Sequence, residues 1–194
     1  MQPDATEPDA RLRRVPSLQH PAHERVVEAA RRKGVELQIT VFSESTHTAA
    51  DAARALNVEI GQIVKSLVFV SPGDDGLEAI VALVSGANRV DVARLAAVVG
   101  SHDLRRATAE EAGQETGFVI GGIPPFGHRK PLRVIMDPDL GRWPLLWAAA
   151  GTPTAVFSVT PQTLRTLANA TVAPLAVEPG MDGERHAASA PSGA

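Results

Sequence analysis

The chain has 194 residues, 44% of them hydrophobic, which is enough for one domain with a substantial buried core. Its formal net charge of −3 argues against the broad basic surface of sequence-independent nucleic-acid binders, although a local basic patch is compatible with it. The absence of cysteine excludes disulfides, thiolate metal sites and thiol nucleophiles. It also suits a reducing compartment, so we expect a cytoplasmic protein.

The ends of the chain are expected to differ from its middle. Both are rich in Pro, Gly, Ala, Ser and charged residues, so we expect disordered tails at 1–15 and 178–194 and one folded domain at 16–177. No apolar stretch is long enough to span a bilayer, and the first residues lack the apolar centre of a secretory signal. We therefore expect a soluble protein without membrane association or export.

Apolar periodicity and turn residues divide the folded region into helices and strands. Thr48 and Asp51 have the spacing of a capping box, and Asn57 can end the helix that it opens. In chain order we predict a helix at 21–33, a strand at 35–42, a helix at 49–56, strands at 63–70 and 77–84 joined as a hairpin by a loop of medium length, helices at 91–100 and 107–116, strands at 118–120, 132–137 and 154–159, a helix at 161–168 and a last strand at 171–177. This mixture predicts an α/β protein with a mixed, mainly antiparallel sheet and helices around it.

Lys65 is the unusual residue of an apolar strand. Alternation places it on one face with Ile63 and Leu67, where an ammonium group needs compensation for its removal from water. Two interpretations remain open. In the first, Lys65 has a structural role: it extends from a sheet edge, or it pairs with a carboxylate such as Glu59 or Asp91. In the second, it points into a cleft and binds an anionic ligand or stabilises a developing charge.

A glycine-proline loop, GGIPP at 121–125, directly follows an apolar segment. Glycines let a ligand approach backbone N–H groups and prolines fix the neighbouring dihedral angles, so the loop can present preorganised donors. A plain tight connection explains the same composition. The loop lacks the GK[ST] of a Walker motif and the spacing of a dinucleotide fingerprint.

Other candidate residues favour structural roles. The six histidines form neither an HExxH motif nor a carboxylate cluster, so we expect no metal site, and no serine has the context of a nucleophile elbow. Trp143 and Trp147 are interpreted as packing residues. His20 and His23, at the start of the first helix, are expected to face solvent.

Four segments, in order, resemble the YbaK family of prolyl-tRNA-synthetase-associated editing domains. They are THTAADAARALNVEIGQIVKSLVF, SGANRVDVARLAAVVG, TGFVIGGIPPFGH and AAAGTPTAVFSVTPQTL, and the resemblance covers about residues 36–176. It implies a mixed sheet of six or seven strands, curled into a partial barrel with surrounding helices. It implies no metal or organic cofactor.

The resemblance also implies an activity, the hydrolysis of the ester between a wrongly attached amino acid and the 3′ end of tRNA. The implied substrate is mischarged aminoacyl-tRNA, first of all tRNA(Pro), and prolyl-tRNA synthetase is the candidate partner. Lys65, Gly121 and Gly122 match the positions implied in catalysis. The positions implied in substrate binding are Phe42, His47, Thr48, Ser66, Asn88, Pro125, His128 and Gly151.

The implied mechanism needs no protein nucleophile. The N–H groups of Gly121 and Gly122 would polarise the ester carbonyl, and Lys65 would orient the terminal phosphate or ribose and support the developing negative charge. A water molecule, or the ribose 2′-hydroxyl acting through it, would attack. Ser66 stands where many members have Thr, and Pro124 where founding members have a small polar residue, which changes loop stiffness or pocket shape.

Two other functions remain open. The chain could be a catalytically idle binding module for tRNA ends, a nucleotide or a synthetase partner, or a hydrolase of another small acyl ester. The retention of Lys65 and both loop glycines favours the deacylase. The sequence does not specify which amino acid is removed.

Overall fold

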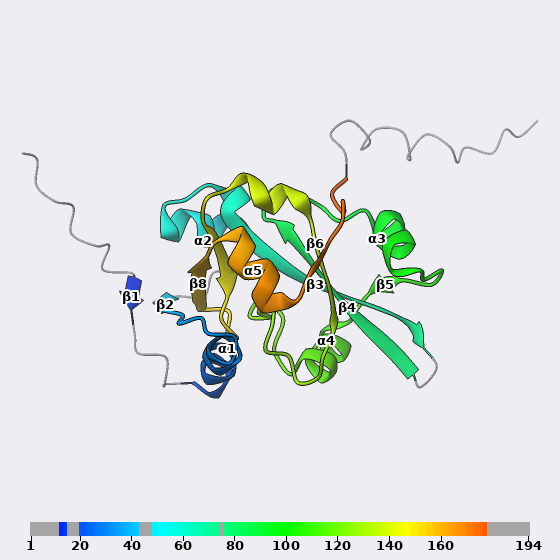
Figure 1. Ribbon diagram of the computed structural model, residues 1–194, viewed down its shortest axis with the longest axis horizontal. Helices are drawn as coiled ribbons and strands as arrows, with labels where there is room; N and C mark the ends of the chain where they lie inside the picture. Colours follow the sequence, from blue (N-terminus) through cyan, green and yellow to red (C-terminus); the bar gives the residue numbers. More distant parts are fainter. Residues whose placement is uncertain (1–11, 15–19, 43–47, 74–75, 178–194) are drawn as a thin grey trace, which may run out of the picture.

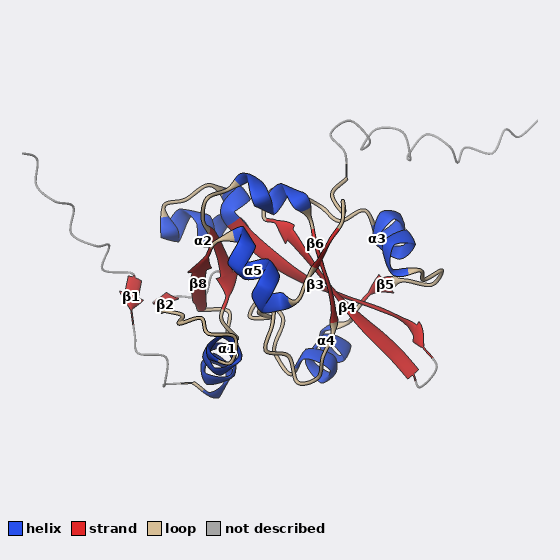
Figure 2. Ribbon diagram, viewed as in Figure 1, coloured by secondary structure: helices blue, strands red, loops and turns tan. Residues whose placement is uncertain are grey.

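The computed structural model describes residues 12–14, 20–42, 48–73 and 76–177 of the chain, and its helices surround a central sheet (Figure 1 and Figure 2). The helices of this part are α1 (Pro21–Arg31), α2 (Ala49–Leu56), α3 (Val92–Val99), α4 (Ala109–Thr116) and α5 (Pro161–Ala168), with short 3-10 helices η1 (Ile60–Gln62) and η2 (Pro138–Arg142). The strands are β1 (Leu12–Arg14), β2 (Ile39–Phe42), β3 (Ile63–Gly73), β4 (Gly76–Ser85), β5 (Arg105–Arg106), β6 (Arg133–Met136), β7 (Leu146–Ala149), β8 (Ala155–Val159) and β9 (Thr171–Val172).

The strands form one mixed sheet in the order β1-β2-β8-β7-β3-β4-β6-β9, with β5 beside β3. The pairs β3/β7, β4/β6 and β6/β9 are parallel, and the other five pairs are antiparallel. The predicted mixed, mainly antiparallel sheet is therefore confirmed. Six of its strands have four or more residues, which agrees with the predicted six or seven strands; β1, β5 and β9 have only two or three residues. The sheet does not close into a barrel.

The β3–β4 hairpin is the longest part of the sheet and runs diagonally through the molecule (Figure 1). Its strands pair from Val64 opposite Ser85 to Gly73 opposite Gly76, which leaves only residues 74–75, outside the described part, between them. The predicted loop of medium length is therefore wrong. The turn-like residues before Gly73 continue the strand instead.

Side chains alternate between the two faces of β3, as the sequence predicts. Val64, Val68 and Val70 belong to the main hydrophobic cluster, which also holds buried residues of α1, α4 and α5. Phe69 belongs to a second cluster with α3, and Ile63 to a third with α2. Helices thus cover both faces of the sheet.

Local capping signals are confirmed. The Thr48 side chain accepts the N–H of Asp51, the Asp51 side chain accepts the N–H of Thr48, and Asn57 ends α2 in the left-handed conformation. Thr108 and Glu111 form the same reciprocal cap at α4. Each cap satisfies backbone donors that a helix leaves unpaired at its start.

The strand predicted at 118–120 is wrong. These residues form a bend and a turn, because Gly117 and Gly121 on either side adopt positive φ angles of 73° and 86°. Two other strands are shorter than predicted: the strand expected at 35–42 begins at Ile39, and the one expected at 171–177 is β9 followed by an isolated bridge between Val90 and Ala176.

The expectation that the first histidines face solvent is only half correct. His20 is exposed, and its Nδ1 accepts the N–H of Ala22 at the start of α1. His23 is buried, and its Nε2 lies 2.9 Å from Oγ1 of Thr152. The segment after β7 folds back on α1, a contact that the local sequence does not reveal.

The ends of the described part only partly test the predicted tails. Residues 12–14 fall within the predicted N-terminal tail and form β1, antiparallel to β2. Residues 1–11 and 178–194 lie outside the described residues, so the tails there and the domain limits 16–177 stay predictions.

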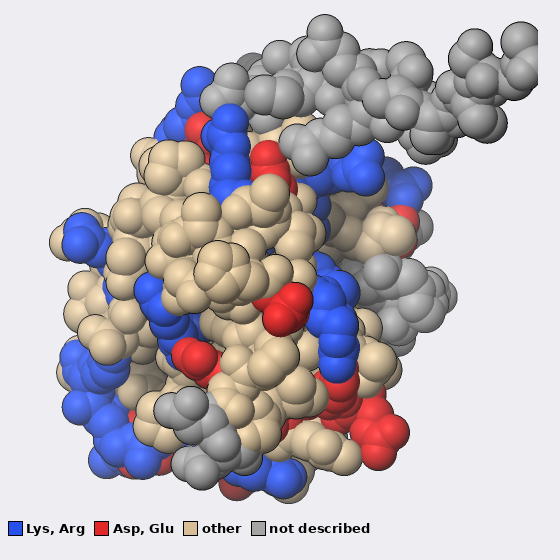
Figure 3. Space-filling model, turned by 90° about the vertical axis from the view of Figure 1, so that its right-hand side faces the viewer, with Lys and Arg blue, Asp and Glu red and all other residues tan. Residues whose placement is uncertain are grey.

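One face of the molecule carries side chains of both charge signs (Figure 3). On the face shown in Figure 3, basic side chains lie in separate groups between uncharged and acidic surface, and they do not form one continuous patch. None of the helices in the described ranges has the length and apolar character needed to span a bilayer.

Asp137 is a buried carboxylate that follows β6. Its Oδ2 accepts the N–H groups of Leu175 and Ala176 at 2.6 and 2.9 Å, and its Oδ1 accepts the N–H of Asp139 at 2.9 Å. This single side chain therefore ties the last described segment to the end of β6.

We predict that Asp137→Ala lowers the free energy of unfolding by about 2–4 kcal/mol, because three backbone donors lose their acceptor. Asp137→Asn is expected to cost less, since one carbonyl oxygen remains. Urea denaturation measures both, and Asp103→Ala, at an exposed position, is the control with an expected change within about 0.5 kcal/mol. Equal losses for Asp137→Ala and Asp103→Ala would contradict this role.

Candidate active site

A cavity of about 340 Å³ lies between β3, β7, β8, the start of α2 and the turn before Gly122. Most of its wall is apolar. The polar side chains in the wall are those of Thr48, Lys65, Ser66, Arg106 and Trp147. Within the described residues, no group of three or more His, Cys, Asp or Glu side chains is placed to hold a metal ion.

The cavity exists because one edge of β3 is only partly covered. β7 pairs with β3 as far as Val64 and β5 pairs with it from Phe69, so neither strand covers Ser66. Alternate residues of an antiparallel strand direct their peptide groups to opposite edges. Since Ile63 O accepts the N–H of Gly86 on the β4 side, the N–H and C=O of Ser66 point away from β4, toward the cavity.

Lys65 lines this cavity and is held by backbone carbonyl groups. Its Nζ donates to Gly86 O at 3.1 Å and to Asn88 O. Among the described residues it makes no ion pair, so the predicted alternative of a pair with Glu59 or Asp91 is not observed. Lys65 is one of the residues that line the cavity, but its Nζ is directed at the turn after β4, so its role in binding a ligand stays a prediction.

Two effects lower the pKa of the Lys65 ammonium group. The larger is desolvation by burial, and the second is the positive charge of Arg106 and Arg89 nearby. Both effects disfavour the charged form, and an anion bound beside Lys65 would oppose them.

Asn88 fixes the turn that holds Lys65. Its Nδ2 donates to Oδ2 of Asp139 at 2.8 Å, and the backbone N–H of Asp139 is in turn bound by Asp137. A continuous set of hydrogen bonds therefore runs from the buried Asp137 carboxylate to the lysine.

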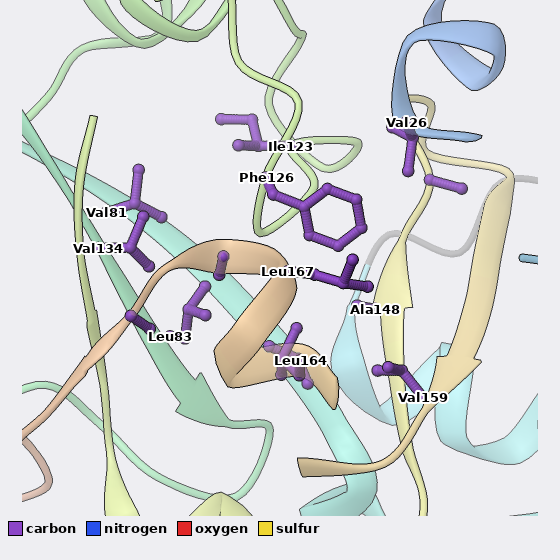
Figure 4. Packing of buried hydrophobic residues seen from close by; sticks show 14 of the residues in the cluster. Val26, Val81, Leu83, Ile123, Phe126, Val134, Ala148, Val159, Leu164 and Leu167 are labelled. Atoms are coloured by element: carbon purple, nitrogen blue, oxygen red, sulfur yellow. The ribbon is translucent and has the colours of Figure 1, made fainter. Parts of the chain in front are cut away.

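Apolar side chains hold the glycine-proline loop against the core. Phe118, Ile123 and Phe126 are buried, and Figure 4 shows Ile123 and Phe126 among the side chains of the main cluster. The ring centroids of Phe126 and Phe157 are 5.6 Å apart. These contacts place Gly121, whose positive φ suits glycine, at the wall of the cavity.

The two backbone N–H groups predicted as donors, those of Gly121 and Gly122, differ in whether the protein already binds them. The N–H of Gly122 donates to Val119 O at 3.0 Å. The N–H of Gly121 has no partner among the described residues, and Gly121 is exposed. Of the two predicted donors, only Gly121 therefore remains available to a ligand.

Close backbone packing holds the rear of the loop. A Cβ atom at Gly122 would lie 2.6 Å from Cα of Thr152, and one at Gly151 would lie 2.8 Å from Ala22 O. The N–H of Gly151 also donates to Gly122 O at 3.0 Å. Both positions need glycine because three backbone segments meet there.

His128 lies behind the loop. Its Nε2 is 2.8 Å from Pro124 O, and its ring meets Phe118 edge to face. The guanidinium group of Arg25 lies over the same Phe118 ring, with its Cζ 3.9 Å from the ring centroid. Arg25 also donates a hydrogen bond to Gly117 O at 2.6 Å. These contacts support the loop from the side opposite the cavity.

Only some of the predicted site residues line the cavity. Those that line the cavity are Lys65, Gly121, Thr48 and Ser66. Those that do not line it are Gly122, Pro125, His128 and Gly151 at the rear of the loop, Asn88 at the Lys65 turn, and Phe42, which is buried at the end of β2. His47 lies outside the described residues.

Two of the polar lining residues, Trp147 and Arg106, were not predicted as site residues. Trp147 was interpreted as a packing residue, and it does pack against Ile63 and α2. However, its Nε1 and the Oγ of Ser66 are buried without a hydrogen-bond partner in the described part, which is unusual for polar atoms beside a cavity. Arg106 carries no local signal, because its place follows from the pairing of β5 with β3.

The family model of the aminoacyl-tRNA editing domain matches residues 43–167, well over half of the chain. The chain belongs to this family. The resemblance predicted from the four sequence segments is thereby confirmed. The match includes both Lys65 and the loop at 121–125, of which Gly121 and Ile123 line the cavity together with Lys65.

Relatives of this editing domain include proteins with named activities. The multifunctional Ser/Thr-tRNA deacylase ProXp-y of Escherichia coli (strain K12) is 26% identical over 122 residues, which are 61% of this chain and 70% of that protein. The proline-tRNA ligase of Thermosipho africanus (strain TCF52B) is 39% identical over 97 residues, 50% of this chain but 16% of the ligase. A crystal structure described as a candidate trans-editing enzyme for prolyl tRNA synthetase is 46% identical, with a TM-score of 0.75 over 82% of this chain and 99% of that chain.

We predict that Gly122→Ala destabilises the editing domain by about 1–3 kcal/mol, because the new Cβ would overlap the Thr152 backbone. Gly141→Ala is the matched control, since a Cβ there meets nothing within 4 Å. Thermal denaturation of both variants measures the difference. A midpoint for Gly122→Ala equal to that of Gly141→Ala would show that the packing behind the loop is not close.

A second prediction concerns pH. Burial lowers the pKa of His128 from its ordinary value of 6.5, and the acceptor Pro124 O opposes this only in part. Because the folded protein then binds this proton less readily than the unfolded chain, the associated stability is complete above about pH 6.5 and decreases as the pH falls below it.

Urea denaturation at pH 7.5 and 5.5 tests this linkage. The free energy of unfolding should decrease less between these pH values in His128→Gln than in the unmodified chain. His102→Gln, which removes an exposed histidine, should leave the difference unchanged. The same pH dependence in all three proteins would contradict the prediction.

Proposed function

We propose that this editing domain is an aminoacyl-tRNA deacylase that hydrolyses the ester of mischarged tRNA(Pro). The observation that carries the proposal is the meeting of Lys65 and Gly121 at one cavity. With about 340 Å³, the cavity is near the lower end of the roughly 300–1,000 Å³ usual for small-molecule sites. It suits an aminoacyl group with part of the terminal nucleotide.

The groups at the cavity match the charge that ester hydrolysis develops. The unpartnered N–H of Gly121 donates to the ester carbonyl oxygen as it becomes negative. Lys65 has three N–H donors, of which two are used by Gly86 and Asn88, so one remains for the oxyanion or the ribose. The free peptide group of Ser66 binds the amino-acid part.

The attacking group comes from solvent. The chain has no cysteine, and no histidine lines the cavity among the described residues. The Oγ of Ser66 is buried without a hydrogen-bond partner among the described residues. The Thr48 hydroxyl donates to the Asp51 carboxylate and accepts the N–H of Asp51, so this pair serves the cap of α2. A water molecule held close to the ester supplies the nucleophile, and the 2′-hydroxyl of the terminal ribose relays the water's proton to the departing 3′ oxygen, so that the ester C–O bond breaks and the amino acid and the tRNA 3′-hydroxyl are released.

Similarity to a prolyl ligase and to a trans-editing enzyme supports tRNA(Pro) as the substrate and prolyl-tRNA synthetase as the partner. The net charge of −3 favours brief engagement of tRNA, since strong autonomous binding needs more basic surface. The lack of cysteine and the nature of the substrate both suit the cytoplasm.

We predict that Lys65→Ala lowers the rate of deacylation by about 10²–10³-fold, the usual effect of removing one preorganised donor. The assay follows loss of the ester from tRNA(Pro) charged with Ala, Ser, Thr, Cys or Pro. Lys33→Ala is the matched control, because Nζ of Lys33 also binds two carbonyl groups, Thr166 O and Leu167 O, but far from the cavity. Its activity should remain unchanged.

The outcomes separate the candidate functions. If the protein binds mischarged tRNA but hydrolyses none of the charged forms, it is a binding module. If Lys65→Ala and Lys33→Ala are equally active, the proposed role of Lys65 is wrong.

A further inference from the structure

Two cationic side chains, those of Lys65 and Arg106, line the cavity together, and the positive charge of a third, Arg89, acts on Lys65. Arg106 pairs in register with Phe69, so its side chain leaves the sheet on the face that also carries Lys65. Arg106 lines the cavity with Lys65, and its Cζ lies 5.3 Å from the centroid of the Phe69 ring. Arg89 directly follows Asn88, whose carbonyl binds Lys65.

This cationic group, Lys65, Arg89 and Arg106, is not neutralised by protein carboxylates. Among the described residues, none of the three makes an ion pair, whereas other cations of the fold do, for example Arg54 with Asp51 and Lys130 with Glu115. Like charges placed together repel, most strongly where water is partly excluded. In a chain with a net charge of −3, such a group is a local exception.

Lys65 has too few N–H donors left to bind both the reacting ester and a phosphate group. Two of its three N–H groups are bound by Gly86 O and Asn88 O, which leaves one for the ester or the ribose. The guanidinium group of Arg106 makes no hydrogen bond to a described residue, and it is exposed at the edge of the cavity. A planar guanidinium with two parallel N–H donors matches two phosphate oxygens.

We infer that Arg106, with Arg89 nearby, binds a phosphodiester group at the 3′ end of the tRNA and thereby positions the terminal nucleotide beside Lys65. The inference rests on the proposed function and adds to it a residue that recognises the RNA backbone. Lys65 then acts at the reacting end, and the phosphate contact belongs to Arg106. Arg106 is a positioning residue in this account.

Arg105 provides a matched control on the same strand. It pairs in register with Val70, so it points to the opposite face of the sheet. Its guanidinium is already bound to both carboxylate oxygens of Glu111, at 2.8 and 2.6 Å. The two neighbouring arginines therefore differ in the two properties that the inference needs, access to the cavity and freedom from a carboxylate.

The kinetic test compares Arg106→Gln with Arg105→Gln on mischarged tRNA. Arg106→Gln should raise KM about tenfold, the usual effect of one charged hydrogen bond, with little change in kcat. The slope of log(kcat/KM) against log salt concentration should become shallower by about 0.7, because one phosphate contact is lost. Arg106→Lys should recover part of the KM, and Arg105→Gln should change neither quantity.

A binding test makes the inference independent of hydrolysis. Isothermal titration of the full chain with a CCA trinucleotide should show an affinity about tenfold lower in Arg106→Gln than in the unmodified protein. Adenosine, which has no phosphate, should bind both equally. If the unmodified protein hydrolyses no mischarged tRNA but trinucleotide binding depends on Arg106, the proposed function fails and the phosphodiester site stands.

Three results would overturn the inference. The first is equal trinucleotide affinity in Arg106→Gln and the unmodified protein. The second is an equal loss in Arg105→Gln, which would indicate a general effect of surface charge. The third is competition by inorganic phosphate as strong as that by the trinucleotide, which would indicate a site for free phosphate. Melting temperatures of all variants identify any loss of folding, and Arg106→Lys, which keeps the charge, then provides the deciding comparison.

Discussion

The uneven pairing of β3 is the constraint on which the rest of the structure depends. β4 covers one edge of this strand along almost its whole length, whereas β7 covers the other edge only as far as Val64. A strand edge without a partner leaves peptide groups unsatisfied, and proteins normally cover such an edge or use it. Here the gap beside Ser66 becomes the cavity. The glycine-proline loop, anchored in the core through Ile123 and Phe126, adds Gly121 and Ile123 to its wall.

Lys65 shows how the fold maintains a charge at this edge. The turn after β4 provides two carbonyl acceptors, Asn88 fixes that turn through Asp139, and the buried Asp137 ties the same region to the last described segment. The lysine therefore has a fixed position without a carboxylate partner in the described part of the chain. An ion pair would have offset the charge that the proposed chemistry uses, whereas neutral carbonyl groups orient the ammonium group and add no negative charge beside it.

The sequence predicts those features that have local causes. The capping box of Thr48 and Asp51 lies within one helical turn, and the alternation along β3 follows from strand geometry, so both were predicted correctly. The strand expected at 118–120 was wrong because three apolar residues do not distinguish a strand from a turn between two glycines. The site could be predicted only where the family resemblance marks it. The burial of His23 depends on Thr152, 129 positions away, and the place of Arg106 depends on the register of β5 against β3; neither leaves a local pattern.

The most direct test of the central claim is to locate the substrate end on the protein. A CCA trinucleotide that carries its amino acid through a stable amide can be titrated into the isotope-labelled chain and followed by amide NMR. The account predicts the largest shifts at the N–H groups of Ser66 and Gly121, and smaller ones at Gly122, whose N–H is already bound to Val119. Shifts centred on His128 and the rear of the loop, with Ser66 and Gly121 unchanged, would contradict the assignment of this cavity as the site of deacylation.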